Sequence, residues 1–245
     1  MHSASRITTA LPLAAASLGL LALGAPASNA QNLLTNGSFE AGNFTGANPN
    51  GVSHLTQLNP SATNITGWTV LSGNNVSDIV WVENGNPYTG NASDGIRSLD
   101  LTGFRDTTPY GGVTQTLTLS PGTFYNLKFD LGSYESTFTF RGPVSARATI
   151  GSLDQTFTFT AAPGSTGQQW GNMTANFSVT SVSNTLQISG VSAAGAQYLG
   201  LDNASITAVS AASAPEPGSV ALLFTGVLPL AGLVARRRAA KATTC

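Results

Sequence analysis

Two stretches of alternating apolar and polar residues, separated by a turn signal, constrain the fold of this chain more than any other feature. In 112–119 the odd-numbered residues Val, Gln, Leu and Leu share one face, and three threonines occupy the other. In 124–131, Tyr, Leu, Phe and Leu alternate with Asn, Lys and Asp, and Pro121-Gly122 predicts a turn in between. A period of two puts alternate side chains on opposite faces, so both stretches are predicted to be half-buried, successive antiparallel strands.

Further short candidate strands follow the same spacing, and no convincing helical period occurs between residues 31 and 213. They cover 67–71, 78–82, 97–101, 144–150, 154–160, 173–180, 185–191 and 199–209. About ten short strands predict an all-β domain, a two-sheet antiparallel sandwich of jelly-roll type. Clusters of Gly, Asn, Pro, Ser and Thr predict loops at 41–63, 83–95 and 161–168.

The N-terminus has the pattern of a secretory signal peptide. Arg6 precedes an apolar run over 11–25, and the small residues Ala27-Ser28-Asn29-Ala30 follow. We therefore expect residues 1–30 to be removed by cleavage after Ala30 and the remainder to be exported.

The C-terminus carries a second apolar segment between a rigid hinge and a basic cluster. The hinge is Ala214-Pro215-Glu216-Pro217, and Val220–Ala235 contains 16 residues without a charge. As a helix this run would rise about 24 Å, against roughly 30 Å for a hydrocarbon core. We expect a transmembrane helix with the arginines on the cytoplasmic side, and a buried core helix is the alternative.

This tail resembles the PEP-CTERM sorting signal of Gram-negative bacteria. The resemblance lies in the proline–glutamate–proline motif, the short apolar helix and the arginine cluster, which are Pro215, Glu216, Pro217, Arg236, Arg237 and Arg238. It implies transient anchoring in the inner membrane, removal of residues 211–245 by an exosortase, and delivery to the cell surface or extracellular matrix. The tail departs from the family pattern by Ala214, where Val is usual, and by the seven residues after Arg238.

Charge and cysteine content exclude some functions for residues 31–213. Five basic and ten acidic residues give this segment a charge of −5, and it has no basic cluster. Nucleic-acid binding, which requires a basic patch, is therefore disfavoured. The one cysteine, Cys245, lies beyond the arginines, so the exported body has neither a disulfide nor a thiol nucleophile.

The body itself resembles the bacterial choice-of-anchor C proteins, which have galactose-binding-like jelly rolls. The resemblance rests on a series of motifs, NLLTNGSFE at 32–40, ITGWTVLSG at 65–73, DGIRSLDLTG at 94–103, GVTQTLTLSPGTFYNLKFDL at 112–131 and LGLDNA at 199–204. It implies a galactose-binding-like sandwich over 31–210 and a surface location, without an established ligand.

Two acids suggest a structural calcium site. Glu40 ends NGSFE and Asp202 lies in LGLDNA, where the carbohydrate-binding modules that this body resembles often hold Ca²⁺. Calcium prefers oxygen ligands from several segments, and one ion would join the first and last strands of a body without disulfides. The alternative is an exposed Glu40 and an Asp202 in a turn or ion pair.

Four aromatic residues are candidates for stacking against a sugar, namely Trp81, Tyr88, Tyr110 and Trp170. Trp68, in an apolar strand, is predicted to belong to the core. Asp100, three residues after Arg97 in a candidate strand, is expected to point inward and to need a partner or a second cation. His54 is expected to be a surface residue.

Three classes of function remain open. The sequence contains no catalytic motif such as G-x-S-x-G, H-E-x-x-H or a P-loop, so we do not expect an enzyme. The first interpretation is a non-catalytic module that binds extracellular polysaccharide. The second is a structural envelope or biofilm protein without a small ligand, and the third is a glycan hydrolase with paired carboxylates.

Overall fold

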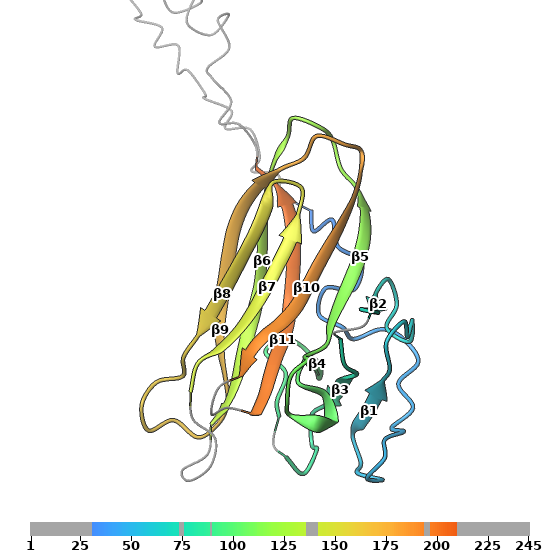
Figure 1. Ribbon diagram of the computed structural model, residues 1–245, viewed down its shortest axis with the longest axis vertical. Coiled ribbons are helices and arrows are strands. Elements are labelled where there is room, and N and C mark those ends of the chain that lie inside the picture. The colour runs from blue at the N-terminus through green and yellow to red at the C-terminus, as the bar shows by residue number, and fades with distance from the viewer. Residues whose placement is uncertain (1–30, 74–75, 89, 136–141, 194–196, 210–245) are drawn as a thin grey trace, which may run out of the picture.

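A computed structural model of the chain describes residues 31–73, 76–88, 90–135, 142–193 and 197–209. Within these ranges two antiparallel sheets face each other in a jelly-roll sandwich (Figure 1). The predicted signal peptide and sorting tail lie outside the described residues. None of the helices in the described part is long and apolar enough to span a bilayer.

The first sheet has six strands in the order β1–β3–β4–β11–β6–β9. Their bounds are Leu55–Leu58, Ile79–Glu83, Arg97–Asp100, Gln197–Ala208, Phe124–Glu135 and Gly167–Ser178. The second has five strands in the order β2–β5–β10–β7–β8. These are Thr69–Val70, Gly112–Thr118, Ser183–Ala193, Val144–Ile150 and Leu153–Phe159. A short 3₁₀ helix, η1, covers Gly103–Arg105.

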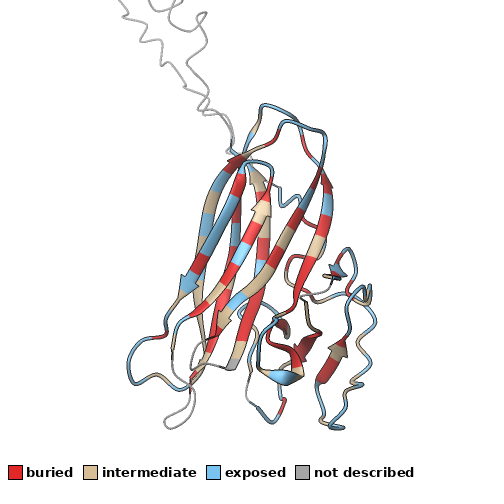
Figure 2. Cartoon of the chain, viewed as in Figure 1, coloured by how far each residue is buried: buried red, intermediate tan, exposed pale blue. Residues whose placement is uncertain are grey.

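The predicted alternation fixes which side chains enter the core between the sheets. Residues 113, 115, 117 and 119, and 125, 127, 129 and 131, are all buried, as predicted. Figure 2 shows the resulting alternation of buried and less buried positions along the strands. The described core lies between Leu34 and Ile206, within the segment 31–209.

The two strands that define the alternation, predicted as successive antiparallel strands, do not pair with each other. β5 pairs with β2 and β10, whereas β6 pairs with β11 and β9 in the opposite sheet. The turn around Pro121-Gly122 therefore carries the chain from one sheet to the other. An alternating pattern identifies the buried face of each strand but leaves its partner open.

One strand and the first half of another lie outside the predicted strands, whereas the second half of β9 coincides with the predicted strand 173–180. β1 is a four-residue strand inside the predicted loop 41–63, and it pairs with β3. β9 begins at Gly167, at the end of the predicted loop 161–168, and its first half pairs with β6 as far as Glu135. The polar residues of both segments hid their strand character, because Gly, Asn and Gln are poor strand signals.

The N-terminal segment lies against the last strand, as the sequence suggested. The amide of Leu33 donates to the carbonyl of Ile206, and Asn32 Oδ1 accepts from the Ile206 amide at 3.0 Å. Gln115 bonds both the amide and the carbonyl of Thr35, as a paired strand would. These bonds join the two ends of the domain, which would otherwise fray.

Candidate functional site

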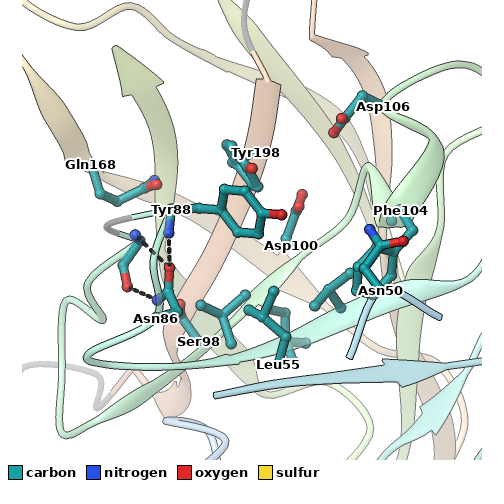
Figure 3. A pocket seen from close by; sticks show the side chains of 16 residues that line it. Asn50, Leu55, Asn86, Tyr88, Ser98, Asp100, Phe104, Asp106, Gln168 and Tyr198 are labelled. Atoms are coloured by element: carbon teal, nitrogen blue, oxygen red, sulfur yellow. Dashed lines mark hydrogen bonds between the residues drawn. The ribbon is translucent and has the colours of Figure 1, made fainter. Parts of the chain in front are cut away.

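A pocket of about 220 Å³ lies on the outer face of the six-stranded sheet, between the ends of its strands and two loops. We call it the Tyr88 pocket (Figure 3). Residues of β1, β3, β4 and β11 contribute the sheet side, the loops 50–55 and 84–96 and η1 contribute the walls, and the start of β9 closes one side. The described lining is Asn50, Leu55, Val80, Val82, Asn86, Tyr88, Gly90, Ser98, Leu99, Asp100, Gly103, Phe104, Asp106, Gln168, Tyr198 and Gly200.

Two asparagines, the buried Asn86 and the half-buried Asn48, give two of the wall loops a fixed conformation. Asn86 donates to the carbonyls of Glu83 and Gly90 and accepts from the amides of Tyr88 and Gly90. Asn48 bonds the backbone of 46–55 in the same way and thereby positions Asn50. Asparagine side chains commonly replace backbone partners in such turns, and here they hold the loops in place without a ligand.

Three tyrosine rings meet at the pocket. The centroid of Tyr198 lies 6.2 Å from that of Tyr88 and 5.4 Å from that of Tyr134, the latter in an edge-to-face arrangement. Figure 3 shows the Tyr88 ring extending from its loop into the middle of the pocket. Tyr88 is 39% exposed, so its ring remains available to a ligand. Burial and the charges of Asp100 and Asp106 raise the pKa of Tyr198.

Two carboxyl groups share one hydroxyl group beneath these rings. Asp100 Oδ1 accepts from the Thr102 amide at 2.9 Å and from Thr102 Oγ1 at 2.7 Å, and that hydroxyl also lies 3.1 Å from Asp106 Oδ1. Burial raises the pKa of Asp100 to about 8, against the lowering effect of the Thr102 bonds. Burial also raises the pKa of Asp106. Asp100 points to the pocket face of β4, whereas Leu99 and Leu101 face the core, so the predicted inward direction is wrong. The expected partner is present, because Thr102 bonds the buried carboxyl group.

Trp170 lies beside the pocket on a surface made by glycines. A β-carbon on Gly132 would lie 2.7 Å from Cζ3 of this ring, and one on Gly200 would lie 2.8 Å from Cη2. Because any larger residue at these two positions would clash with the ring, only glycine lets the indole lie directly against the two central strands. The indole Nε1 donates to the carbonyl of Asn91 at 2.9 Å, which fixes the orientation of the ring.

Gln168 places a polar atom without a partner between this ring and the pocket. Its Nε2 is the one buried side-chain nitrogen or oxygen in the described part of the chain that makes no hydrogen bond. It would lie 2.3 Å from a β-carbon on Gly132 and 2.9 Å from one on Gly200. A buried donor without an acceptor is costly, and Gln168 also lines the pocket, so a ligand oxygen toward which this side chain turns would remove that cost.

Glu40 and Asp202 both hold the loop that carries Asn91. Glu40 Oε1 accepts from the amides of Ile96 and Arg97, each at 2.8 Å. Asp202 Oδ2 accepts from the amides of Ser93 and Asp94. Burial raises the pKa of Asp202 to about 7, although these amide bonds lower it.

The two acids predicted to share a calcium ion have no hydrogen-bond partner in common among the described residues. The cross-strand neighbour of Asp202 is Asp130, not Glu40. No group of three or more His, Cys, Asp or Glu side chains in the described ranges could hold a metal ion.

The remaining candidates lie elsewhere. Trp81 is fully buried and donates to the carbonyl of Phe39, so its predicted role in stacking is corrected. The DIVWV run is apolar on both faces because Val80 and Val82 face the pocket while Trp81 faces the core. Tyr110 packs against Gly190 and the core, and it is absent from the described lining of the pocket. Trp68 is a core residue, as predicted.

His54 is exposed, as predicted, and its Nδ1 lies 2.9 Å from Glu83 Oε2. This partner was not predicted, because Glu83 is distant in the chain and only the pairing of β1 with β3 brings it close. Gln168, Tyr198 and Asn86 line the pocket but were not predicted from the sequence, because each lies in a polar loop or at a strand end.

No protein-family model matches the chain, and no curated protein matches it. The fold is similar to solved structures of carbohydrate-binding modules. One is the CBM22-1 xylan-binding domain of Paenibacillus barcinonensis Xyn10C, with 20% identity, 64% of this chain and 94% of that chain covered, and a TM-score of 0.37. TmCBM61 in complex with β-1,4-galactotriose has 17% identity, 73% and 99% coverage, and a TM-score of 0.40. A family 35 module from Clostridium thermocellum has 10% identity, 62% and 97% coverage, and a TM-score of 0.33.

Proposed function

We propose that the described domain is a non-catalytic module that binds a neutral carbohydrate in the Tyr88 pocket. The observation that supports this most is the combination of an available tyrosine ring, an indole held in place beside it, and a buried amide donor without an acceptor. These three groups belong to Tyr88, Trp170 and Gln168. Sugars present both C–H faces, which suit aromatic rings, and hydroxyl groups, which suit amides and carboxyls.

Rigidity favours binding over a purely structural role. The asparagine-bonded loops and the glycine surface under Trp170 hold the aromatic groups in position before any ligand arrives. Preorganised groups lose little conformational entropy when a ligand binds. In a purely structural protein, an open pocket with an unpaired buried amide would lower the stability of the fold without serving any function.

The polar groups of the pocket favour an uncharged ligand. Its described lining contains two carboxyl groups, Asp100 and Asp106, and neither arginine nor lysine. A uronic acid or sulfated sugar would bring a negative charge toward these groups without a basic partner. Neutral hydroxyl groups can instead donate to or accept from them.

A glycan hydrolase is the second candidate, and one observation favours it. The pKa of Asp100 is raised to about 8, so its carboxyl group stays protonated at neutral pH, as a general acid requires. Asp106 would have to supply the second carboxylate. Release of reducing ends from a bound polysaccharide would distinguish this activity from simple binding, and Asp100→Asn should abolish it.

Export and sorting are part of the same proposal. The described core residues, Leu34 to Ile206, all lie between the two predicted cleavage positions, so cleavage at both would retain every one of them. We expect exosortase processing to release the domain to the cell surface or matrix, where polysaccharide is its partner. Mass spectrometry of native material should show an N-terminus near Gln31 and no Arg236–Arg238, and an intact tail would contradict the sorting.

Calcium binding at Glu40 and Asp202 also remains a proposal. Both carboxylates already accept hydrogen bonds from backbone amides, which neutralise part of their charge. A calcium ion would therefore need further oxygen ligands in addition to these two groups. EDTA should lower the melting temperature of the wild type, and Asp202→Ala should respond less. The same melting temperature with and without EDTA, together with no metal in elemental analysis, would exclude the ion.

Binding is tested by affinity electrophoresis of residues 31–209 in gels that contain a panel of neutral and anionic polysaccharides. We expect retardation by at least one neutral polysaccharide, weaker or no retardation by anionic ones, and loss of retardation in Tyr88→Ala. Threonine 116, on the opposite sheet, provides a matched control as Thr116→Ala. Free migration of the wild type through every gel would favour the structural role instead.

A further inference from the structure

The outward-facing residues of β9 continue from the pocket along the edge of the six-stranded sheet. Odd-numbered positions of this strand, such as Met173 and Phe177, pack into the core, so the even-numbered ones face outward. In order these are Gln168, Trp170, Asn172, Thr174 and Asn176. At about 3.4 Å per residue this row spans roughly 27 Å. The unpaired Gln168 amide stands at its pocket end, and the last three residues are exposed.

Side-chain bonds across to the neighbouring strand hold most of this row in place. Asn126 of β6 donates to Thr174 Oγ1 at 3.0 Å and to Asn176 Oδ1 at 2.8 Å. Asn172 donates to Asp130 Oδ1 at 2.9 Å. The side-chain amides of Asn172 and Asn176 have more donors and acceptors than these bonds use, so the row presents ordered groups that can still bind hydroxyl groups.

The charges beside the row cancel locally. Lys128 and Asp130 are successive outward residues of β6 and lie opposite Thr174 and Asn172. Asp130 also accepts from Asn203 and Ser93, which further spreads its charge. These two residues therefore add no net charge beside the row.

We infer that the binding site extends from the Tyr88 pocket over Trp170 and along β9 to Asn176, and that the ligand is an internal stretch of a linear neutral polysaccharide. This inference rests on the proposed function. The pocket and the Trp170 ring bind one part of the chain, and the Asn and Thr side chains of the row bind the sugars that follow. A site for a single terminal sugar would need the pocket alone.

The test measures affinity as a function of ligand length by isothermal titration calorimetry. The probes are oligosaccharides of two to six residues from β-1,4-glucan, β-1,4-xylan, β-1,4-galactan and α-1,4-glucan, added to residues 31–209. For the probe that binds, we expect the dissociation constant to fall roughly tenfold from the disaccharide to the hexasaccharide, because each added sugar gains hydrogen bonds of modest net strength. Asn172→Ala and Thr174→Ala should each weaken hexasaccharide binding several-fold and leave disaccharide binding unchanged.

Thr116→Ala is the matched control, because Thr116 also makes a cross-strand side-chain bond, to Thr185, but on the opposite sheet. It should leave every dissociation constant unchanged, and the melting temperature of all three variants should stay close to that of the wild type. Length-independent affinity, or a length dependence that neither row variant reduces, would overturn the extended site and leave the pocket proposal intact. If the wild type binds none of the four series, the proposed function fails and the extended site fails with it.

Discussion

The two sheets of this sandwich share one core, yet their outer faces are built differently. The outer face of the six-stranded sheet carries tyrosine rings, a fixed indole and buried carboxyl groups, and two loops shelter it. The outer face of the five-stranded sheet carries short hydroxyl side chains such as Thr116, Thr156, Thr158 and Thr185, all of them exposed. Among the described residues this face has one ion pair, between Arg147 and Asp154, and both side chains of the pair are exposed.

The two faces differ in the energetic cost of the residues that they carry. Threonine on an open face needs only β propensity and contact with water. The Tyr88 pocket requires features that are unfavourable unless they serve a purpose, among them a fully buried carboxyl group, an unpaired amide and glycines inside central strands. We therefore take the first face as functional and the second as solvent surface, and the following experiments test that contrast.

Replacing the fixed indole should have the largest effect. Trp170→Ala removes the ring that covers Gly132 and Gly200, and truncation of a central aromatic contact commonly weakens binding by roughly thirtyfold or more. The dissociation constant for the retained polysaccharide, measured by calorimetry, reports the change. Thr116→Ala should bind like the wild type, and equal losses in the two variants would remove the distinction between the faces.

Replacing Asp202 should destabilise the loop that supports this indole. Asp202→Asn puts an amide nitrogen or a weaker acceptor in front of the Ser93 and Asp94 amides, and buried donors left without a good acceptor cost about 1–3 kcal/mol of unfolding free energy. Chemical denaturation measures this loss. Asp154→Asn on the other sheet is the matched carboxylate control and should leave stability unchanged. A stable Asp202→Asn with an unaltered loop would show that these bonds are dispensable.

The pH dependence of stability should come from the functional face. The pKa of Asp100 is about 8 in the folded protein and near 3.8 when unfolded. Its contribution is therefore complete below about pH 4 and is lost as the pH rises through 8, with a slope of up to about 1.4 kcal/mol per pH unit. Asp106 and Asp202, whose pKa values are also raised, add to the same trend.

Asp100→Asn keeps an acceptor for Thr102 and removes the titrating group. Its unfolding free energy should fall less between pH 5 and pH 8 than that of the wild type. Parallel curves for the two proteins would mean that Asp100 does not resist ionisation in the folded state.

The smallest effect is expected from the exposed ion pair on the second face. Arg147→Ala removes the partner of Asp154, and solvent screens both groups. Surface pairs of this kind contribute little to stability. The melting temperature should be unchanged within error, whereas a clear decrease would show that the five-stranded face is organised as tightly as the other.

The sandwich could be predicted from the sequence because the alternation of apolar and polar residues shows directly which face of each strand is buried. Strands such as β5, β7 and β11 lie close to their predicted ranges, and their apolar positions are in the core. Partners were harder to predict. The sequence predicted β5 and β6 as successive antiparallel strands, but it did not show that the turn at Pro121-Gly122 crosses between the sheets, because the sheet that a strand joins depends on contacts far away in sequence.

The candidate site was predicted only in part. Tyr88 and Trp170 were found because aromatic residues next to polar loops are conspicuous, and Trp81 was misassigned because its strand is apolar on both faces. Gln168 and Tyr198 could not be found, since nothing local distinguishes them from other polar or strand residues. Their importance depends on the glycines and carboxyl groups that pairing between strands brings next to them.

The location of a bound sugar can be measured directly from the three tryptophans of the chain. Trp68 and Trp81 are in the core, and Trp170 alone lies beside the pocket. A ¹⁵N–¹H spectrum of indole-labelled residues 31–209 should show three indole signals, with that of Trp170 identified by its loss in Trp170→Phe. Titration with the retained polysaccharide's oligosaccharide should shift the Trp170 signal strongly and the other two little. Saturable binding that leaves the Trp170 signal in place would contradict a carbohydrate site at the Tyr88 pocket.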